Sequence, residues 1–333
     1  MLRTDVLAPF EGRGGACAGD GPVSREDEGD SAVRLRSSIR RYAAERRYAQ
    51  LFGRCINATD TERVVAHGLV GLLDRRERPL RVLDMGAGRG DISAILAETA
   101  DVVDAVEPNR HHLRDLRSLA DSNPRIRVAE GSIQDFRTDA RYDLIALVYV
   151  VESIADSDLA RHVERLLDLR KPGGRVVGVT YLDGCALDAF SSAVQHVIPF
   201  GRTDAVSRVF PRLRAGGLNV HNLDVVRSEF RASSVDELFD VLSFFYMQEL
   251  GAYRRLRPAL SRELQQYVES DGEGVRLVVE NVLYEIFPMA QSLRDGSGLR
   301  DATQAASTGR RLEEPRGLRR RLARVCRHKG NGT

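Results

Sequence analysis

Three glycines stand at alternate positions directly after a short apolar segment. Gly86, Gly88 and Gly90 follow residues 81–85 and give the pattern G-x-G-x-G. Because glycine has no Cβ, such a backbone can approach a ligand closely, although a tight strand-to-helix turn uses the same residues. A dinucleotide site would have its third glycine one position later, where this chain has Asp91. A carboxylate in the first turn of the next helix repels a pyrophosphate, so the pattern argues against a dinucleotide.

Acidic side chains near the glycines indicate which ligand groups fit beside them. Asp84 comes just before the loop, where a carboxylate suits a ligand with a cationic amino group. Glu107 follows the glycines by roughly 20 residues and ends the next apolar segment, a position from which a carboxylate accepts hydrogen bonds from ribose hydroxyls. Residues 130–136 follow the third apolar segment and offer carboxylate and amide groups that can bond an adenine amino group.

Apolar segments alternate with helical patterns through the middle of the chain, and this alternation predicts the elements that position those side chains. A helix is expected from about Thr61. The expected strands are 81–85, 102–106, 125–129, 142–150 and 174–180, and the helices between them are 91–98, 110–120 and 158–169. Strands separated by helices at this spacing predict a parallel sheet with helices on both faces. After Tyr181 we expect helices at 183–197 and 204–215, an extended segment at 218–231, a helical insert at about 235–269 and a last strand at 275–287.

These segments, in this order, resemble the motif series of class I S-adenosylmethionine methyltransferases. Two further segments complete the series, Tyr142–Ile145 at the start of the fourth strand and Arg170–Arg175 in a tight turn before the fifth. The resemblance covers roughly residues 60–182 and implies S-adenosyl-L-methionine as the cofactor. It also implies an α/β, Rossmann-like fold with a seven-stranded, mostly parallel sheet and helices on both faces. A helical cap from the N-terminus and the insert before the last strand would complete the fold.

The same resemblance assigns roles to individual cofactor-binding residues. Asp84, Gly86 and Gly88 would hold the methionine portion, and Glu107 would hold the ribose. The segment from Ser132 to Asp135 would contact the adenine, and Val148, at the end of the fourth strand, would line the same site.

The flanking segments are similar to one branch, the histamine N-methyltransferase-like enzymes. The similarity spans most of residues 45–287. It rests on Tyr48–Phe52 with Thr59–Glu62, on Tyr149–Asp156, and on Leu223–Val225, Leu238–Phe245 and Val279–Leu283. In that branch a Glu, a Gln and an Asn contact the acceptor, which implies acceptor-side or catalytic roles for Glu62, Tyr149 and Asn281. Tyr149 replaces the Gln, and this departure argues against imidazole as the acceptor. The residues alone favour a helix first-turn charge for Glu62 over a ligand role. They leave Tyr149 open between a position in the site and ordinary core packing.

Composition bounds the remaining possibilities. The chain has 333 residues and a net charge of +2, so no global excess of charge points to nucleic acid. Four separated cysteines indicate free thiols, and no His or Cys spacing suggests a metal site. The longest apolar run, 144–151, is too short for a membrane span, so a cytoplasmic protein without membrane contact is expected. Residues 1–30 are expected to be disordered, 31–289 to form the domain, and 290–333 to be a flexible basic tail.

The leading hypothesis is methylation of a small metabolite, at nitrogen rather than oxygen, by in-line displacement under a helical lid. The alternative keeps the fold and the cofactor but makes the enzyme a lyase or cyclase, in which the cofactor's amino group attacks its own side chain and methylthioadenosine leaves. A third hypothesis is a cofactor-fold protein without activity that acts as a binding partner. The partner expected here is a small-molecule substrate, not nucleic acid, and the sequence leaves the oligomeric state open.

Overall fold

The computed structural model describes residues 46–73, 79–198, 205–270 and 272–289. The chain divides into two units, 1–287 and 288–333, and only Pro288 and Met289 of the second unit are described. The predictions for residues 1–45 and for the basic tail at 290–333 lie outside the described residues. The domain boundaries therefore stay predictions.

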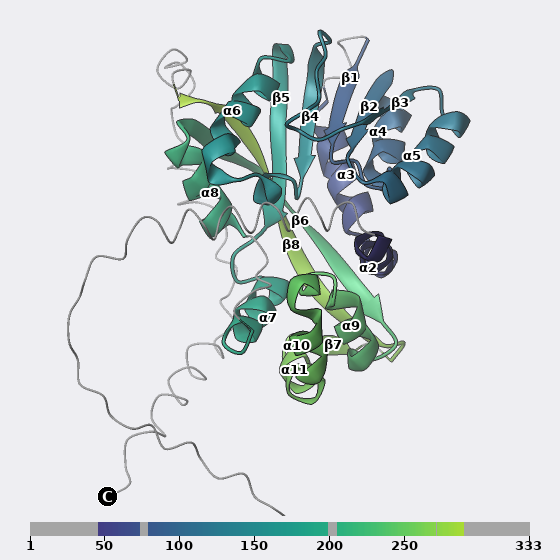
Figure 1. The fold of residues 1–333 in the computed structure, drawn as a ribbon, viewed down its shortest axis with the longest axis vertical. Helices are drawn as coiled ribbons and strands as arrows, with labels where there is room; N and C mark the ends of the chain where they lie inside the picture. Colours follow the sequence, from purple (N-terminus) through teal and green to yellow (C-terminus); the bar gives the residue numbers. More distant parts are fainter. Residues whose placement is uncertain (1–45, 74–78, 199–204, 271, 290–333) are drawn as a thin grey trace, which may run out of the picture. The chain divides into compact units, whose positions relative to one another are not determined.

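Seven strands form one twisted sheet in the order β3-β2-β1-β4-β5-β8-β6 (Figure 1). Strands β1 to β5 pair in parallel, and β8 pairs antiparallel with β5. A two-residue strand, β7, pairs with β8 beside this row. The mostly parallel, Rossmann-like sheet predicted from the sequence is thus confirmed. The strands are β1 Arg81–Met85, β2 Val102–Glu107, β3 Ile126–Glu130, β4 Tyr142–Val148, β5 Arg170–Tyr181, β6 Leu218–Ala232, β7 Glu269–Ser270 and β8 Val275–Pro288.

Helices cover both faces of the sheet because alternate residues of each central strand point to opposite sides. Val82 packs with the side chains of α3 (Thr61–Gly71), α4 (Asp91–Thr99) and α5 (Arg110–Ser122). Its neighbour Leu83 packs with those of α6 (Asp156–Leu167) and α8 (Val206–Ala215). Burial on both faces explains why these strands read as continuous apolar runs in the sequence.

The two longest strands of the second half, β6 and β8, continue beyond the sheet and carry a second lobe (Figure 1). Its core includes Phe230 of β6 and Val279 of β8. The helices that contribute to it are α2 Arg46–Asn57, α7 Ala186–Gln195, α9 Val235–Leu242, α10 Leu250–Arg255 and α11 Arg257–Leu264, together with a 3-10 turn at Met247–Glu249. A second 3-10 turn, Val151–Ser153, follows β4 and packs on the α6 side of the sheet instead. The predicted helical insert before the last strand is therefore present.

Several predicted boundaries were wrong, among them those of α6, which spans Asp156–Leu167 rather than 158–169. Strand β4 ends at Val148 rather than at residue 150, because Tyr149 adopts a left-handed backbone with φ of 53° that cannot continue a strand. The segment predicted as a turn before the fifth strand is already part of β5, which starts at Arg170 and shifts register between its β4 partners Tyr142 and Leu144. Helix α7 starts at Ala186, three residues later than expected.

Among the described residues, no helix is long and apolar enough to cross a membrane. The same residues contain no group of three or more His, Cys, Asp or Glu side chains arranged to hold a metal ion. Cys55 and Cys185 are both buried free thiols.

Candidate active site

The glycine loop joins β1 to α4 and has the backbone that its sequence requires. Gly86, Gly88 and Gly90 all have positive φ, at 83°, 58° and 96°. The N–H groups of Gly86 and Ala87 donate to the carbonyl of Val106 at 2.8 and 3.0 Å, which ties the loop to the end of β2. A Cβ at Gly86 would lie 2.6 Å from Cγ2 of Val150, so this glycine is needed for packing as well as for φ.

Asp84 is buried beneath the loop, with a relative exposure of 2%. One of its oxygens, Oδ2, accepts a 2.5 Å hydrogen bond from the hydroxyl of Ser93 on α4. Burial raises the pKa of this carboxyl to about 6, the Ser93 hydrogen bond lowers it, and the nearby charge of Glu107 raises it further. No described cationic side chain forms an ion pair with Asp84. A ligand ammonium would fit this position, because it would stabilise the charged carboxylate that burial disfavours.

Glu107 lies at the end of β2 with both carboxylate oxygens held by backbone. Oε2 accepts from the N–H of Gly88 at 2.8 Å, and Oε1 accepts from the N–H of Asn109 at 2.7 Å. His112 of α5 lies behind it, with Nδ1 3.8 Å from Oε1. A carboxylate has about four acceptor positions, so Glu107 fixed in this way still has capacity for ribose hydroxyls.

The predicted adenine segment lies beside Glu107, because Gly131 donates to the Glu107 carbonyl at 3.2 Å. The Ser132 hydroxyl lies 2.6 Å from both Oε1 of Gln134 and Oδ2 of Asp135 and can donate to one of them at a time. Asp135 is exposed and Ser132 is half-buried. Val148, the last residue of β4, is half-buried at the same carboxyl-terminal edge of the sheet. The residues predicted to hold the cofactor thus follow β1, β2, β3 and β4 along the edge where open α/β sheets bind ligands. Their contacts with the cofactor remain a proposal.

Tyr149 and Asn281 are 132 positions apart in the sequence, yet their side chains are directly bonded. The Tyr149 hydroxyl donates to Oδ1 of Asn281 at 2.5 Å. Asn281 is fully buried in β8, and its Nδ2 donates to Oγ of Ser228 at 2.8 Å and to the carbonyl of Val226 at 3.3 Å. Ser228 in turn lies 2.8 Å from the hydroxyl of Thr61 at the start of α3. We call Tyr149, Asn281, Ser228 and Thr61 the polar chain.

Glu62 follows Thr61 in the first turn of α3, and its carboxyl has an unusual environment. Burial raises its pKa to about 7 and its own backbone N–H lowers it. The charge of Asp91 raises the pKa again, and the charge of Arg89 lowers it. The pKa values of Tyr149 and Tyr181 are raised first by burial, and the Glu62 charge raises them further. Glu62 therefore lies near both tyrosines. No described Lys, Arg or His forms an ion pair with it.

Aromatic rings connect the surroundings of Tyr149 with the glycine loop. The Tyr181 ring stacks on Tyr149 at 4.8 Å and meets Phe245 at 6.2 Å. Phe244, the residue before Phe245, packs against Tyr48 and Phe52 of α2, with ring centroids 5.5 Å apart in both pairs. The Phe52 ring would lie 3.5 Å from a Cβ on Gly88. An aromatic cover thus runs from the acceptor side of the site to the glycine loop.

His112 lies beside Glu107, a position that the sequence did not predict. It is buried, with 3% exposure, and its ring packs against Tyr48 at 5.6 Å and against Phe52 at 4.8 Å. The available signal was its spacing of five residues after Glu107 on an amphipathic helix. That spacing does not reveal which of two adjacent histidines points inward.

Comparisons with known proteins identify the family of the chain. A family model described as a methyltransferase domain matches residues 58–240, more than half of the chain. Among solved structures, the YcgJ protein from Bacillus subtilis is 18% identical, with a TM-score of 0.45 over 66% of this chain and 97% of that one. An S-adenosyl-L-homocysteine complex of N-methyltransferase NodS from Bradyrhizobium japonicum WM9 is 11% identical, with a TM-score of 0.40 over 67% of this chain and 86% of that one. A methyltransferase from Geobacter sulfurreducens, also with S-adenosyl-L-homocysteine, is 14% identical, with a TM-score of 0.40 over 67% and 90%. The comparison with curated proteins gave no sequence match.

These findings do not confirm the histamine N-methyltransferase-like branch, and they lend no support to the lyase alternative. They do confirm the predicted enzyme class and cofactor. With its glycine loop, buried Asp84 and Glu107 in the strand order described above, the chain belongs to the methyltransferase-domain family and is an S-adenosylmethionine-dependent methyltransferase.

Proposed function

We propose that the enzyme methylates a nitrogen of a small-molecule amine held between Glu62 and the stacked rings of Tyr149 and Tyr181. The observation that carries this proposal is Glu62 itself, a half-buried carboxyl with a pKa of about 7. The charge of Arg89 lowers that pKa, but no described side chain forms an ion pair with Glu62. A cationic amine would supply that partner. The adjacent ring faces would add cation–π stabilisation, which Trp, Tyr and Phe offer to ammonium groups.

The environment of Glu62 also suits the chemistry of amine methylation. An amine must lose its proton before its nitrogen can act as a nucleophile, and a carboxylate with a pKa near the working pH can accept that proton. When bound, S-adenosylmethionine supplies an electrophilic methyl group on a sulfonium. Asp84 and Glu107 would hold the cofactor, and the aromatic cover over the loop would exclude water from both reactants.

Tyr149 is the residue most directly placed to orient the acceptor. Its left-handed backbone turns the side chain out of the β4 line, and the polar chain then fixes its hydroxyl. Asn281, by contrast, uses both amide donors and an oxygen lone pair within the protein. We therefore assign Asn281 a positioning role that acts through Tyr149 rather than contact with the substrate.

The test is a panel of small amines and matched alcohols, with S-adenosylhomocysteine release as the readout, on the wild type and on Glu62→Gln. Loss of a charge-assisted hydrogen bond costs about 1.5–3 kcal/mol, so kcat/KM for amines should fall roughly 10- to 150-fold. The wild-type rate should also rise with pH through about 7, and Glu62→Gln should lose this step.

Glu98→Gln on α4 is the matched control, because Glu98 is exposed and its replacement makes the same charge change. Equal activity of Glu62→Gln and wild type, or equal use of amines and alcohols, would show the proposal to be wrong. A reaction with the cofactor alone that yields methylthioadenosine would instead identify intramolecular chemistry.

A further inference from the structure

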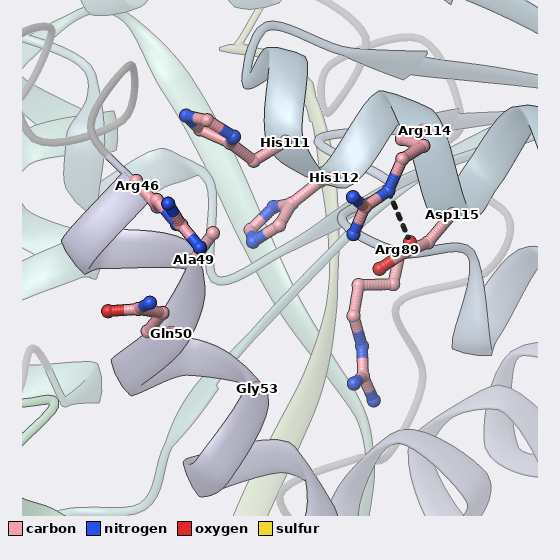
Figure 2. A pocket seen from close by; sticks show the side chains of 9 residues that line it. All are labelled: Arg46, Ala49, Gln50, Gly53, Arg89, His111, His112, Arg114 and Asp115. Atoms are coloured by element: carbon pink, nitrogen blue, oxygen red, sulfur yellow. Dashed lines mark hydrogen bonds and ion pairs between the residues drawn. The ribbon is translucent and has the colours of Figure 1, made fainter.

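A pocket of about 550 Å³ lies on the outer side of α2, and the proposed chemistry makes no use of it (Figure 2). Its walls are one face of α2, from Arg46 to Gly53, and the first turns of α5, from His111 to Asp115, with Arg89 of the glycine loop between them. We call it the α2–α5 pocket. Tyr48 and Phe52, on the inner face of the same helix, contact the aromatic cover instead. Helix α2 therefore separates this pocket from the acceptor region.

The lining of the α2–α5 pocket is strongly basic. Arg46, Arg89 and Arg114 line it with two histidines, and Asp115 is its only acidic residue among those described. Arg89 also forms a 3.4 Å ion pair with Asp91, which lies outside the lining. Asp115 lies 3.4 Å from Arg114, and both side chains are exposed, a geometry in which ion pairs contribute little. The N-terminal end of α5, a 13-residue helix, adds the positive end of its dipole. The combined field favours an anion in this pocket.

Two histidine nitrogens in the lining lack partners. Nε2 of His112 and Nε2 of His111 are buried and have no hydrogen-bond partner among the described residues. His112 is only 3% exposed, and Figure 2 shows its ring reaching from α5 toward α2. Where Nε2 carries a hydrogen, as it does in a protonated ring, a buried N–H without an acceptor is costly, because the group loses its hydrogen bond to water and gains nothing in return. An anionic oxygen in the pocket would satisfy such a donor.

We propose that the α2–α5 pocket binds the phosphate group of a small molecule and that this ligand joins α2 to the body of the fold. The pocket volume falls within the range of small-molecule sites and exceeds what a phosphate ion alone needs. Arg46 and Arg114 come from the two walls, so one phosphate bonded to both holds the helices together. His112 belongs to both regions, since its ring lines the pocket while its Nδ1 faces Glu107.

Clamping α2 has a consequence for the cofactor. Phe52 of α2 lies over Gly88, so an anion that holds α2 in place also holds the cover over the cofactor loop. Linkage then requires that the anion and the cofactor strengthen each other's binding by the same factor. Binding of the anion at the α2–α5 pocket does not depend on the acceptor, so it can be measured whatever the methylated substrate is.

The experiment titrates the full-length protein with inorganic pyrophosphate by calorimetry at constant ionic strength, with and without S-adenosylhomocysteine. We expect one site with millimolar or tighter affinity and tighter binding of S-adenosylhomocysteine in its presence. Arg114→Gln should weaken pyrophosphate about fivefold, the effect of losing one solvated charged contact. Arg117→Gln, on the same helix but outside the pocket, makes the same charge change and should bind like the wild type.

Four results would overturn all or part of the proposal. No pyrophosphate binding at millimolar concentrations would exclude the site, and equal weakening by the two arginine variants would reveal only a diffuse charge effect. Competition between pyrophosphate and S-adenosylhomocysteine would show that the basic pocket serves the carboxylate of the cofactor itself. If pyrophosphate binds but leaves the affinity for S-adenosylhomocysteine unchanged, the clamp on α2 is wrong.

Discussion

The buried carboxyl of Asp84 predicts a specific pH dependence of cofactor binding. Without ligand its pKa is about 6, against an ordinary 3.8, mainly because burial disfavours the charged form. The proposed partner of Asp84 is the cationic amino group of the cofactor, which requires the carboxylate. Protonation of Asp84 therefore competes with binding, and the affinity must fall as the pH drops below the raised pKa.

The size of the effect follows from that pKa. Protonation multiplies the apparent Kd by one plus the ratio of protonated to ionised Asp84. This factor is about 1 at pH 8 and about 11 at pH 5. The tenfold loss corresponds to about 1.4 kcal/mol. A carboxyl with the ordinary pKa of 3.8 would lose only about 6% of its affinity over the same range.

Calorimetric titration with S-adenosylhomocysteine at several pH values measures this loss directly. Asp84→Asn keeps the shape and the Ser93 contact, but should bind about 10- to 150-fold more weakly because a charged hydrogen bond is lost. Its affinity should not change between pH 8 and pH 5. Methylthioadenosine lacks the amino group of the methionine portion, so its binding to the wild type should show no such pH dependence. The Glu62→Gln variant should bind S-adenosylhomocysteine with the wild-type pH dependence. A wild-type affinity that stays constant with pH, or an Asp84→Asn variant with the wild-type slope, would refute the reasoning.

Three further substitutions probe the fold around the site. Asn281→Ala should lower the free energy of unfolding by about 3 kcal/mol, because it leaves buried polar groups without hydrogen-bond partners. Tyr149→Phe should then lower it little further in that background. Additive losses in a double-mutant cycle would show that the polar chain does not act as a unit. Gly86→Ala should cost about 2–3 kcal/mol in urea denaturation, and Val150→Ala should relieve the steric part but not the cost of its positive φ. Both ring nitrogens of buried His162 lack partners among the described residues, so His162→Leu should raise the free energy of unfolding by about 1 kcal/mol. An unchanged melting temperature would show that the unpartnered nitrogens cost no stability. Burial and then two nearby arginines lower the pKa of His162, so its unfolded form binds the proton first, and the advantage of His162→Leu should grow as the pH falls below 6.5.

Local patterns in the sequence determined the cofactor half of the site well. Strand β1 was predicted with its observed limits, because an apolar run that ends in glycines leaves little choice of register. Asp84 and Glu107 were found because strand ends in a parallel sheet meet at one edge. The acceptor half depends on contacts across long sequence separations. Nothing near Tyr149 in the sequence indicates its bond to Asn281, and the pairing of α2 with α5 through His112 is equally non-local.

The strand order has a consequence for how the chain folds. β6 is made before β8 but lies at the edge of the sheet, where β8 separates it from β5. During synthesis β6 can therefore form its antiparallel bridge from Phe230 to Thr59, but it joins the row of strands only when β8 inserts, and until then Ser228 has no Asn281 to bond. Strands β1 to β5 can pair earlier, since each finds its partner among residues already made. Insertion of β8 is thus the slow, non-local step that completes the acceptor half of the site, because closing such long loops is entropically costly. A nascent chain would form its cofactor loop first and gain its acceptor side only when this last strand arrives.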